Sequence, residues 1–377
     1  MRYPKFLQGG GRIGFIAPSF GCSTEPYKSL FIAAQERFAK LGYGLVLGPN
    51  AYAEAGIGKS NTPELCGAEI NDFFLNDRSD AIISCGGGET MCEDLPFVDF
   101  DAISKAEPKW YMGYSDNTHM TFLLPTLLDT AAIYGPCGPE FGMRFWDESL
   151  SDAFRLLTGE QYSFTSYDKW EREGHRGAEH PLASFRKKKD TAIISENWDG
   201  KPISGRFIGG CLDILEMYPG TKNDRVKQFA EHYKEDGIIW FIEACDLNTL
   251  SMSRVLWHLR NAGWFKHVKA FLVGRPAWFE DASWGLTHYE AVMREVRRIE
   301  AEEEKETGVL RKIPVIMDFP IGHLKPMVPM VSGGFGTISR LSAPKGTQEV
   351  FETLDDGSKA LFTRTLEEKL EITFQRK

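Results

Sequence analysis

The sequence predicts an α/β protein of two domains, and three observations lead to this prediction. The chain has 377 residues, whereas a typical domain has about 150. In the first half, short apolar runs alternate with helical patterns, which indicates a parallel sheet with helices on both faces. In the second half, strand-like runs and helices mix less regularly, as in a mixed α/β domain. We place the domains at residues 1–165 and 199–377, joined by a linker or long loop at 166–198.

The first domain is predicted to hold five strands. Apolar runs bounded by turn residues indicate each strand, and apolar residues at helical spacing indicate the helices between them. Gly42 follows the first helix at the position of a C-terminal cap. The predicted strands are Ile13–Ala17, Gly44–Leu47, Ala81–Ser84, Trp110–Gly113 and Ala131–Tyr134, and the predicted helices are Leu30–Leu41 and Glu64–Asn76.

The 166–198 segment lacks a clean periodicity and carries the basic run Arg186–Lys189. Loops of this length are usually functional or mobile. Beyond it, the same reasoning predicts five further strands and two long helices. The strands are Ile203–Ile208, Ile238–Ile242, Ala270–Val273, Pro314–Met317 and Glu371–Phe374, and the helices are Ser251–Ala262 and Ser283–Glu306.

Composition excludes several classes of protein. With 42% hydrophobic and 26% charged residues, the chain resembles an ordinary globular protein. A net charge of -9 argues against a general nucleic-acid binder. No apolar stretch approaches the ~18 residues that span a bilayer, and the first residues do not resemble a signal peptide. The seven cysteines are scattered without a C-x-x-C pair, which disfavours disulfides and structural zinc. We therefore expect a cytoplasmic protein that does not bind membranes.

The segment Gly113–Thr118 carries the first chemical signal. It follows a predicted strand and opens a helical pattern, so Ser115 lies on a tight strand-to-helix turn. Such a turn exposes the hydroxyl at the carboxyl end of the sheet, beside backbone N–H groups that can stabilise an oxyanion. Asn117 replaces the second glycine of the α/β-hydrolase elbow. Ser115 is therefore either a nucleophile or a helix cap.

The glycine run Gly86–Gly88 directly follows another predicted strand. Consecutive glycines allow close backbone approach and leave N–H groups free to point inward. Loops at the carboxyl ends of parallel strands line the same crevice, so this turn is expected to face Ser115. A phosphate cradle is the alternative, but neither G-x-G-x-x-G nor a P-loop pattern is present.

A serine nucleophile needs a base and a group that orients the base. Among eight histidines, His323 stands out because it lies in a Gly- and Pro-bounded loop after an apolar run. Glu243 ends the apolar run Gly237–Ile242, so it is expected to be buried and to need a partner. His323 can be that partner. The alternatives are a structural loop histidine and a salt bridge from Glu243 to Arg254 or to a neighbouring lysine.

Taken together, these segments resemble the serine peptidase family of LD-carboxypeptidases and microcin C self-immunity proteins. The resemblance extends from about Ile13 to Ile338, and the order and spacing of its segments make it specific. The matching segments are Ile16–Ser19, Ile83–Gly88, Gly113–Asp116, Tyr134–Pro136, Gly205–Leu212, Ile239–Glu243, and Gly322–His323 with Pro326.

The resemblance implies a fold and a set of catalytic residues. The fold is a flavodoxin-like parallel-sheet N-terminal domain and a smaller mixed C-terminal domain, with the active site at their junction. Ser115 becomes the nucleophile, His323 the general base and acid, and Glu243 the group that orients the imidazole. The backbone N–H groups of Gly88 and Asp116 form the oxyanion hole. The resemblance also implies a homodimer without metal or cofactor.

Some positions depart from the typical LD-carboxypeptidase. The oxyanion turn reads Cys85–Glu89 instead of Arg-Gly-Gly-Tyr-Gly, and Cys211 replaces a common asparagine. The segments Leu95–Asp101 and Tyr134–Pro136 are closer to the microcin C branch. These differences affect the expected substrate and leave the triad unchanged.

The predicted function is a serine carboxypeptidase that hydrolyses an amide next to a free carboxylate, acting on murein-type peptides. Within the family, the alternative substrate is a peptidyl- or aminoacyl-nucleotide. Two alternatives lie outside it: a non-catalytic nucleotide-binding module that uses the glycine turn, and a cysteine hydrolase that uses Cys137. The partner is therefore a small molecule, and no nucleic acid is expected.

Two residues are predicted to contact the substrate. Trp198 lies at the end of the irregular segment, where an indole in a cleft loop offers a face on which adenine can stack. The alternative is that it packs the domain junction. Lys325 follows His323 in the same loop and is predicted to lie within reach of the substrate.

Overall fold

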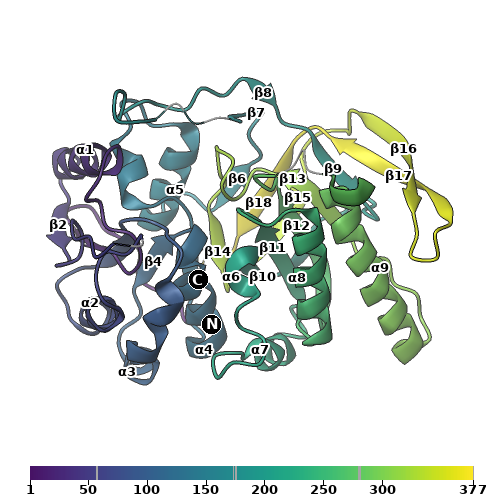
Figure 1. The fold of residues 1–377 in the computed structure, drawn as a ribbon, viewed down its shortest axis with the longest axis horizontal. Helices are drawn as coiled ribbons and strands as arrows, with labels where there is room; N and C mark the ends of the chain where they lie inside the picture. Colours follow the sequence, from purple (N-terminus) through teal and green to yellow (C-terminus); the bar gives the residue numbers. More distant parts are fainter. Residues whose placement is uncertain (57, 173, 175, 279–281, 377) are drawn as a thin grey trace.

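The computed structural model describes residues 1–56, 58–172, 174, 176–278 and 282–376. Two sheets lie side by side, and the chain passes from the first to the second in Figure 1. None of the helices in the described ranges is long and apolar enough to span a membrane. The α/β class and the sheets with parallel strands confirm the predicted fold class.

The N-terminal sheet has six strands in the order β14-β5-β4-β3-β1-β2. Strands β1 to β5 are parallel, and their order is that of flavodoxin-like folds. The expected strands are present within one residue. Their bounds are β1 (Arg12–Ile16), β2 (Gly44–Leu47), β3 (Ala81–Ser84), β4 (Trp110–Gly113) and β5 (Ala132–Tyr134).

Helices cover this sheet where the sequence has apolar residues at helical spacing. The first helix ends as predicted, because Gly42, just beyond its last turn, adopts a φ of +88°. Three short 3₁₀ helices lie beyond the carboxyl ends of β3 and β5. The helices are α1 (Tyr27–Lys40), α2 (Pro63–Leu75), α3 (Phe100–Lys105), α4 (Thr118–Leu128) and α5 (Glu148–Thr158), with η1 (Met91–Glu93), η2 (Leu95–Phe97) and η4 (Gly138–Gly142).

The C-terminal sheet is the larger of the two, with ten strands against six, which corrects the expectation of a smaller domain. Its centre consists of four parallel strands, β10 (Ile203–Cys211), β11 (Ile238–Glu243), β12 (Val268–Gly274) and β13 (Val315–Phe319). Antiparallel strands extend both sides of this centre. They are β9 (Ile193–Glu196), β16 (Gly346–Thr353) and β17 (Lys359–Glu367) on one side, and β15 (Phe335–Arg340), β18 (Leu370–Phe374) and β6 (Ser163–Thr165) on the other.

The two long helices of the second half begin at side-chain caps. Asn248 accepts a hydrogen bond from the Ser251 N–H at the start of α8 (Thr249–Asn261). Thr287 and Glu290 form a capping box, so α9 (His288–Thr307) begins later than predicted from Ser283. The shorter helices are α6 (Leu212–Leu215) and α7 (Val226–His232), and Ser283–Gly285 form the separate 3₁₀ helix η5.

The two sheets exchange strands. β6 precedes the predicted boundary at residue 165 but pairs with β18 in the C-terminal sheet, and β14 (Met330–Ser332) pairs with β5 in the N-terminal sheet. The predicted 166–198 linker contains β9 of the C-terminal sheet and a small ribbon of β7 (Lys169–Trp170) and β8 (Lys189–Asp190). Only part of this segment is therefore loop. Positions 173 and 175 lie outside the described residues.

Helix α4 joins the two halves. Phe122 and Leu123 on this helix belong to the same buried cluster as Trp240 on β11. At the start of the helix, Thr118 packs against Gly210 of β10 so closely that a Cβ on Gly210 would lie 2.6 Å from the Thr118 methyl. Because α4 begins just after Ser115, this contact fixes the serine turn relative to the C-terminal sheet.

Candidate active site

Ser115 occupies the turn between β4 and α4, in the short 3₁₀ helix η3 (Ser115–Asn117). Its φ of +64° lies in the left-handed region that residues with a Cβ rarely adopt, a form of strain common at functional sites. No side chain caps η3 or α4, so the helix-cap alternative for Ser115 is wrong.

His323 and Ser115 are brought together from opposite halves of the chain. His323 lies in the loop after β13, and its Nε2 is 2.9 Å from the Ser115 Oγ. The imidazole also packs against the Tyr114 ring, with centroids 5.2 Å apart. His323 therefore lies in the loop predicted from the sequence, and it contacts Ser115 as expected.

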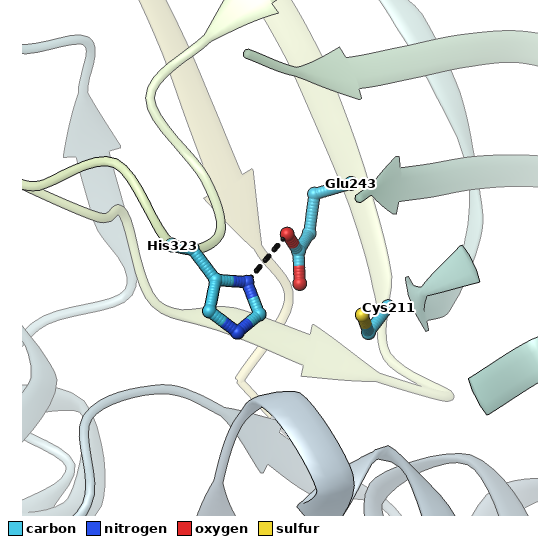
Figure 2. Close-up of side chains that lie close together, drawn as sticks. All are labelled: Cys211, Glu243 and His323. Atoms are coloured by element: carbon cyan, nitrogen blue, oxygen red, sulfur yellow. Dashed lines mark hydrogen bonds and ion pairs between the residues drawn. The ribbon is translucent and has the colours of Figure 1, made fainter. Parts of the chain in front are cut away.

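Glu243 ends β11 with its side chain fully buried. Its Oε2 lies 2.8 Å from the His323 Nδ1, and Figure 2 shows the imidazole facing the carboxylate. The loop can approach this closely because residue 322 is glycine: a Cβ there would lie 2.6 Å from the same carboxylate oxygen. Glu243 pairs with His323, so the alternative pairing with Arg254 is wrong.

The charges of Glu243 and His323 stabilise each other. Burial alone raises the pKa of Glu243, but the charge of His323 and hydrogen bonds from His323, Tyr134 and Cys211 outweigh it, so the pKa falls below its ordinary value. Burial likewise opposes protonation of His323. The charge of Glu243 and contacts with Cys245 and Glu243 nevertheless raise the pKa of His323 to about 10. The surroundings of the pair therefore favour the carboxylate form of Glu243 and the imidazolium form of His323.

Tyr134 is a site residue that sequence reasoning did not assign. Its hydroxyl donates to the Glu243 Oε1 at 2.5 Å and accepts from the Ser115 N–H at 3.3 Å. Tyr134 is the last residue of β5 and begins a segment that matched the family, which was the available signal. The Tyr134 hydroxyl thus links Glu243, at the end of β11, to the turn after β4 that carries Ser115.

The glycine turn after β3 faces Ser115, as predicted. A Cβ on Gly87 would lie 3.1 Å from the Ser115 Cβ and 3.2 Å from its Oγ. Gly88 has a φ of +153°, and Asn117 donates to the Gly86 carbonyl at 2.8 Å. The predicted oxyanion donors, the N–H groups of Gly88 and Asp116, thus belong to the two segments that meet at the serine.

Cys211 lies beside Glu243 and His323, and among the described residues these three form the one group whose ligand atoms, within 4.8 Å of one another, could hold a metal ion (Figure 2). Cysteine, histidine and glutamate are zinc ligands. Here, however, Glu243 and His323 are hydrogen-bonded to each other. Burial and the charge of Glu243 also raise the pKa of the Cys211 thiol well above its ordinary value. Such a protonated thiol is a poor ligand.

Cys137 does not fit the cysteine-hydrolase alternative. The residue is buried, and burial together with the charge of Glu140 raises the pKa of its thiol to about 12. A nucleophilic cysteine needs an accessible thiolate with a lowered pKa. Cys137 instead belongs to the capping box of η4 with Glu140.

Lys325 lies near the serine turn but already has partners. Its Nζ is 3.1 Å from the Glu140 Oε1 and 3.8 Å from the centre of the Tyr114 ring. Both charged side chains are nearly buried. The structure therefore places Lys325 beside the residue that precedes Ser115, with its charge balanced by Glu140.

Trp198 lies away from the site, so the predicted adenine-stacking role is wrong. It shares a surface hollow with Lys269 and Pro314, where β12 and β13 begin. Glu243 lies at the opposite end of β11, and His323 follows the opposite end of β13. The indole is 8% exposed, and Arg340 covers its ring at 4.7 Å. Trp198 thus packs against Arg340 of β15, within the C-terminal sheet.

Two proteins of similar sequence align with most of this chain. Microcin C7 self-immunity protein MccF of Escherichia coli is 28% identical over 336 residues, which cover 86% of this chain and 89% of the relative. A candidate carboxypeptidase of Vibrio cholerae is 26% identical over 344 residues, which cover 90% of this chain and 95% of the relative.

Solved structures share the fold. MccF in complex with aspartyl sulfamoyl adenosine has a TM-score of 0.73 at 23% identity and covers 98% of this chain and 99% of that chain. An MccF-like protein from Bacillus anthracis has a TM-score of 0.70 at 21% identity and covers 98% of this chain and 100% of that chain.

Family models match both halves of the chain. The model of the LD-carboxypeptidase N-terminal domain matches residues 13–135, which include Ser115 and the glycine turn. The model of the C-terminal domain matches residues 204–338, which include Glu243 and His323. The two matches together span more than half of the chain, which therefore belongs to the LD-carboxypeptidase family.

Proposed function

We propose that this protein is a serine hydrolase that cleaves an amide bond next to a free carboxylate. Ser115 is the nucleophile, His323 the general base and acid, and Glu243 the group that orients the imidazole. The observation that carries the proposal is the unbroken chain of contacts from Ser115 to His323 and from His323 to Glu243, at 2.9 Å and 2.8 Å. Nucleophile, base and orienting acid joined in this order are the parts of a hydrolytic triad.

The proposed reaction has two halves. In the first, the Ser115 Oγ attacks the carbonyl carbon while the neutral His323 Nε2 accepts the hydroxyl proton. The oxyanion is stabilised by the N–H groups of Gly88 and Asp116, and His323 returns the proton to the leaving nitrogen as the acyl-enzyme forms. In the second, His323 takes a proton from water, which attacks the ester, and the proton returns to Ser115 when the product acid leaves. No step requires a metal or cofactor.

The substrate class proposed first is a murein-type peptide with an L-to-D bond before a terminal D-alanine. The family of both matching models and the carboxypeptidase-like relative support it. The second candidate is a peptidyl- or aminoacyl-nucleotide. It is favoured by the relative MccF and by the solved MccF complexes with aspartyl sulfamoyl adenosine and glutamyl sulfamoyl guanosine.

One experiment separates these candidates. The purified protein is assayed on a murein tetrapeptide and on an aminoacyl sulfamoyl adenosine side by side, with product release measured by chromatography. A fluorophosphonate probe that labels Ser115 would separate either hydrolase from the non-catalytic nucleotide-binding alternative. Binding of the nucleotide without turnover, and without labelling of Ser115, would favour that alternative.

The pH profile provides a prediction. Because the pKa of His323 is raised from its ordinary 6.5 to about 10, the imidazole is mostly protonated at neutral pH and cannot accept the Ser115 proton. We expect kcat/KM to keep rising between pH 7 and pH 9, by up to about tenfold per pH unit, as the base loses its proton. A profile that is already flat above pH 7 would contradict the raised pKa.

Substitution of Gly87 provides a second prediction. A methyl group there would crowd the Ser115 Cβ and Oγ at 3.1–3.2 Å, so the nucleophile must move by a few tenths of an ångström. We expect Gly87→Ala to lower kcat by about tenfold to a hundredfold, since small displacements of reacting groups have large effects. Gly9→Ala, where a Cβ would meet nothing within 4 Å, is the matched control. Wild-type kcat in Gly87→Ala would show that the turn does not press on the nucleophile.

A further inference from the structure

The proposed mechanism uses the backbone N–H of Asp116 but not its side chain, which is fully buried directly after the nucleophile. A buried carboxylate has to be compensated by hydrogen bonds or charges. Its Oδ2 accepts hydrogen bonds from the Ser19 Oγ at 2.5 Å and from the Met91 N–H at 3.0 Å. Asp116 therefore connects the loops that follow β1 and β3.

Both contacts hold the glycine turn. Ser19 packs directly on Gly88, where a Cβ would lie 2.1 Å from the Ser19 Oγ. Met91 is the first residue of η1, at the far end of the same turn. One carboxylate oxygen thus contacts both sides of the segment that contains the proposed oxyanion donor Gly88.

The second oxygen of the carboxylate faces another buried side chain. The Asp116 Oδ1 lies 3.5 Å from the His119 Nε2, and neither atom has a hydrogen-bond partner among the described residues. The other ring nitrogen of His119 is hydrogen-bonded to the Tyr218 hydroxyl. Burial lowers the pKa of His119 to about 4, so the ring is neutral. If the Tyr218 hydroxyl donates to Nδ1, the ring proton is on Nε2 and points at Asp116.

We propose that the Asp116 carboxylate is a positioning group for the oxyanion hole, holding the Gly88 N–H in place through Ser19 and Met91, with His119 supporting its free oxygen. This inference rests on the proposed function. It gives Asp116 two separate roles: its backbone N–H is one oxyanion donor, and its side chain fixes the other donor, the Gly88 N–H. Backbone donors stabilise a transition state only when they are fixed in advance of the reaction.

The test uses two substitutions on the complete chain. Asp116→Asn removes the charge with little change in shape, and Ser19→Ala removes only the hydroxyl that bridges Asp116 and Gly88. We expect kcat to fall by about tenfold to a hundredfold in Asp116→Asn and by about tenfold in Ser19→Ala, with KM nearly unchanged. Ser23→Ala is the matched control, because the Ser23 hydroxyl lies in the same loop and has no partner among the described residues.

A second readout separates a positioning role from a general loss of structure. The substrate that proves active in the side-by-side assay is compared with its analogue that carries sulfur in place of the scissile carbonyl oxygen. Sulfur is larger and accepts hydrogen bonds weakly, so an intact oxyanion hole favours the oxygen substrate. We expect Asp116→Asn and Ser19→Ala to reduce this preference, whereas a folding defect lowers both rates equally.

The outcomes also separate this inference from the proposed function. Wild-type kcat in Ser19→Ala, or equal losses on the two substrates in both variants, would overturn the positioning role. If instead Ser115→Ala retains turnover, the proposed function itself is wrong. Should Asp116→Asn fail to fold, Ser19→Ala still tests the positioning role, because it removes one hydroxyl and leaves the Asp116 carboxylate in place.

Discussion

A Ser115→Ala variant is expected to fold like the parent chain and to lose turnover by roughly 10⁴- to 10⁶-fold, as when other triads lose their nucleophile. The hydroxyl lies 2.9 Å from the His323 Nε2, so its removal takes away the atom that the base activates. Alanine keeps the Cβ that the left-handed turn already accommodates, so the backbone strain is unchanged.

Turnover of Ser115→Ala is measured on both candidate substrates, and the unfolding midpoint is measured by circular dichroism. Ser23→Ala again provides the control for removal of a hydroxyl. More than about a tenth of the wild-type rate in Ser115→Ala would exclude the triad mechanism as a whole. A large fall in the unfolding midpoint would instead make the lost turnover uninformative.

The Glu243→Gln variant is expected to lose activity by about 10⁴-fold, as other triads do when their orienting acid becomes an amide. Tyr134 can still donate to the amide oxygen, as it does to the Glu243 Oε1. The amide nitrogen then faces the His323 Nδ1 and favours the tautomer with its proton on Nε2. In that tautomer, the imidazole cannot accept the Ser115 proton.

The pH profile of Glu243→Gln carries independent information. The charge of Glu243 raises the pKa of His323, so its removal lowers that pKa, and the acid limb of the residual activity should move to lower pH. Glu300→Gln is the control for neutralising a buried carboxylate, since Glu300 pairs with Lys312 outside the site. Normal activity in Glu243→Gln would reassign only the orienting acid.

The parallel strands and the residues at their carboxyl ends could be predicted because local pattern determines them. Apolar runs identify buried strands, and turn chemistry places Ser115 and His323 in the segments that follow β4 and β13, with Glu243 as the last residue of β11. Of the antiparallel additions, β18 was predicted as the strand Glu371–Phe374, whereas the others could not be predicted in this way. The hairpin β16–β17 has mostly exposed or half-exposed side chains, so no apolar run marks it, and the pairing of β6 with β18 joins segments far apart in the chain.

Two errors about single residues have the same origin. The sequence places Trp198 next to a family segment, but proximity along the chain does not tell at which edge of a sheet a side chain lies. Tyr134 was overlooked because a tyrosine at a strand end looks like a core residue. Its role depends on two partners, Ser115 and Glu243, that are distant in sequence. Long-range contacts of this kind are fixed by the sheet order, which local pattern does not reveal.

The exchange of strands between the sheets has a consequence for the newly made chain. As residues emerge from the ribosome in order, β1 to β5 can pair early, but β5 keeps an open edge until β14 arrives at residues 330–332. His323 is made only just before that strand. The N-terminal sheet therefore cannot be completed, and the base cannot reach the serine, until this late part of the chain has been made. A chain that stalls before this point has an unpaired strand edge but no assembled hydrolytic site.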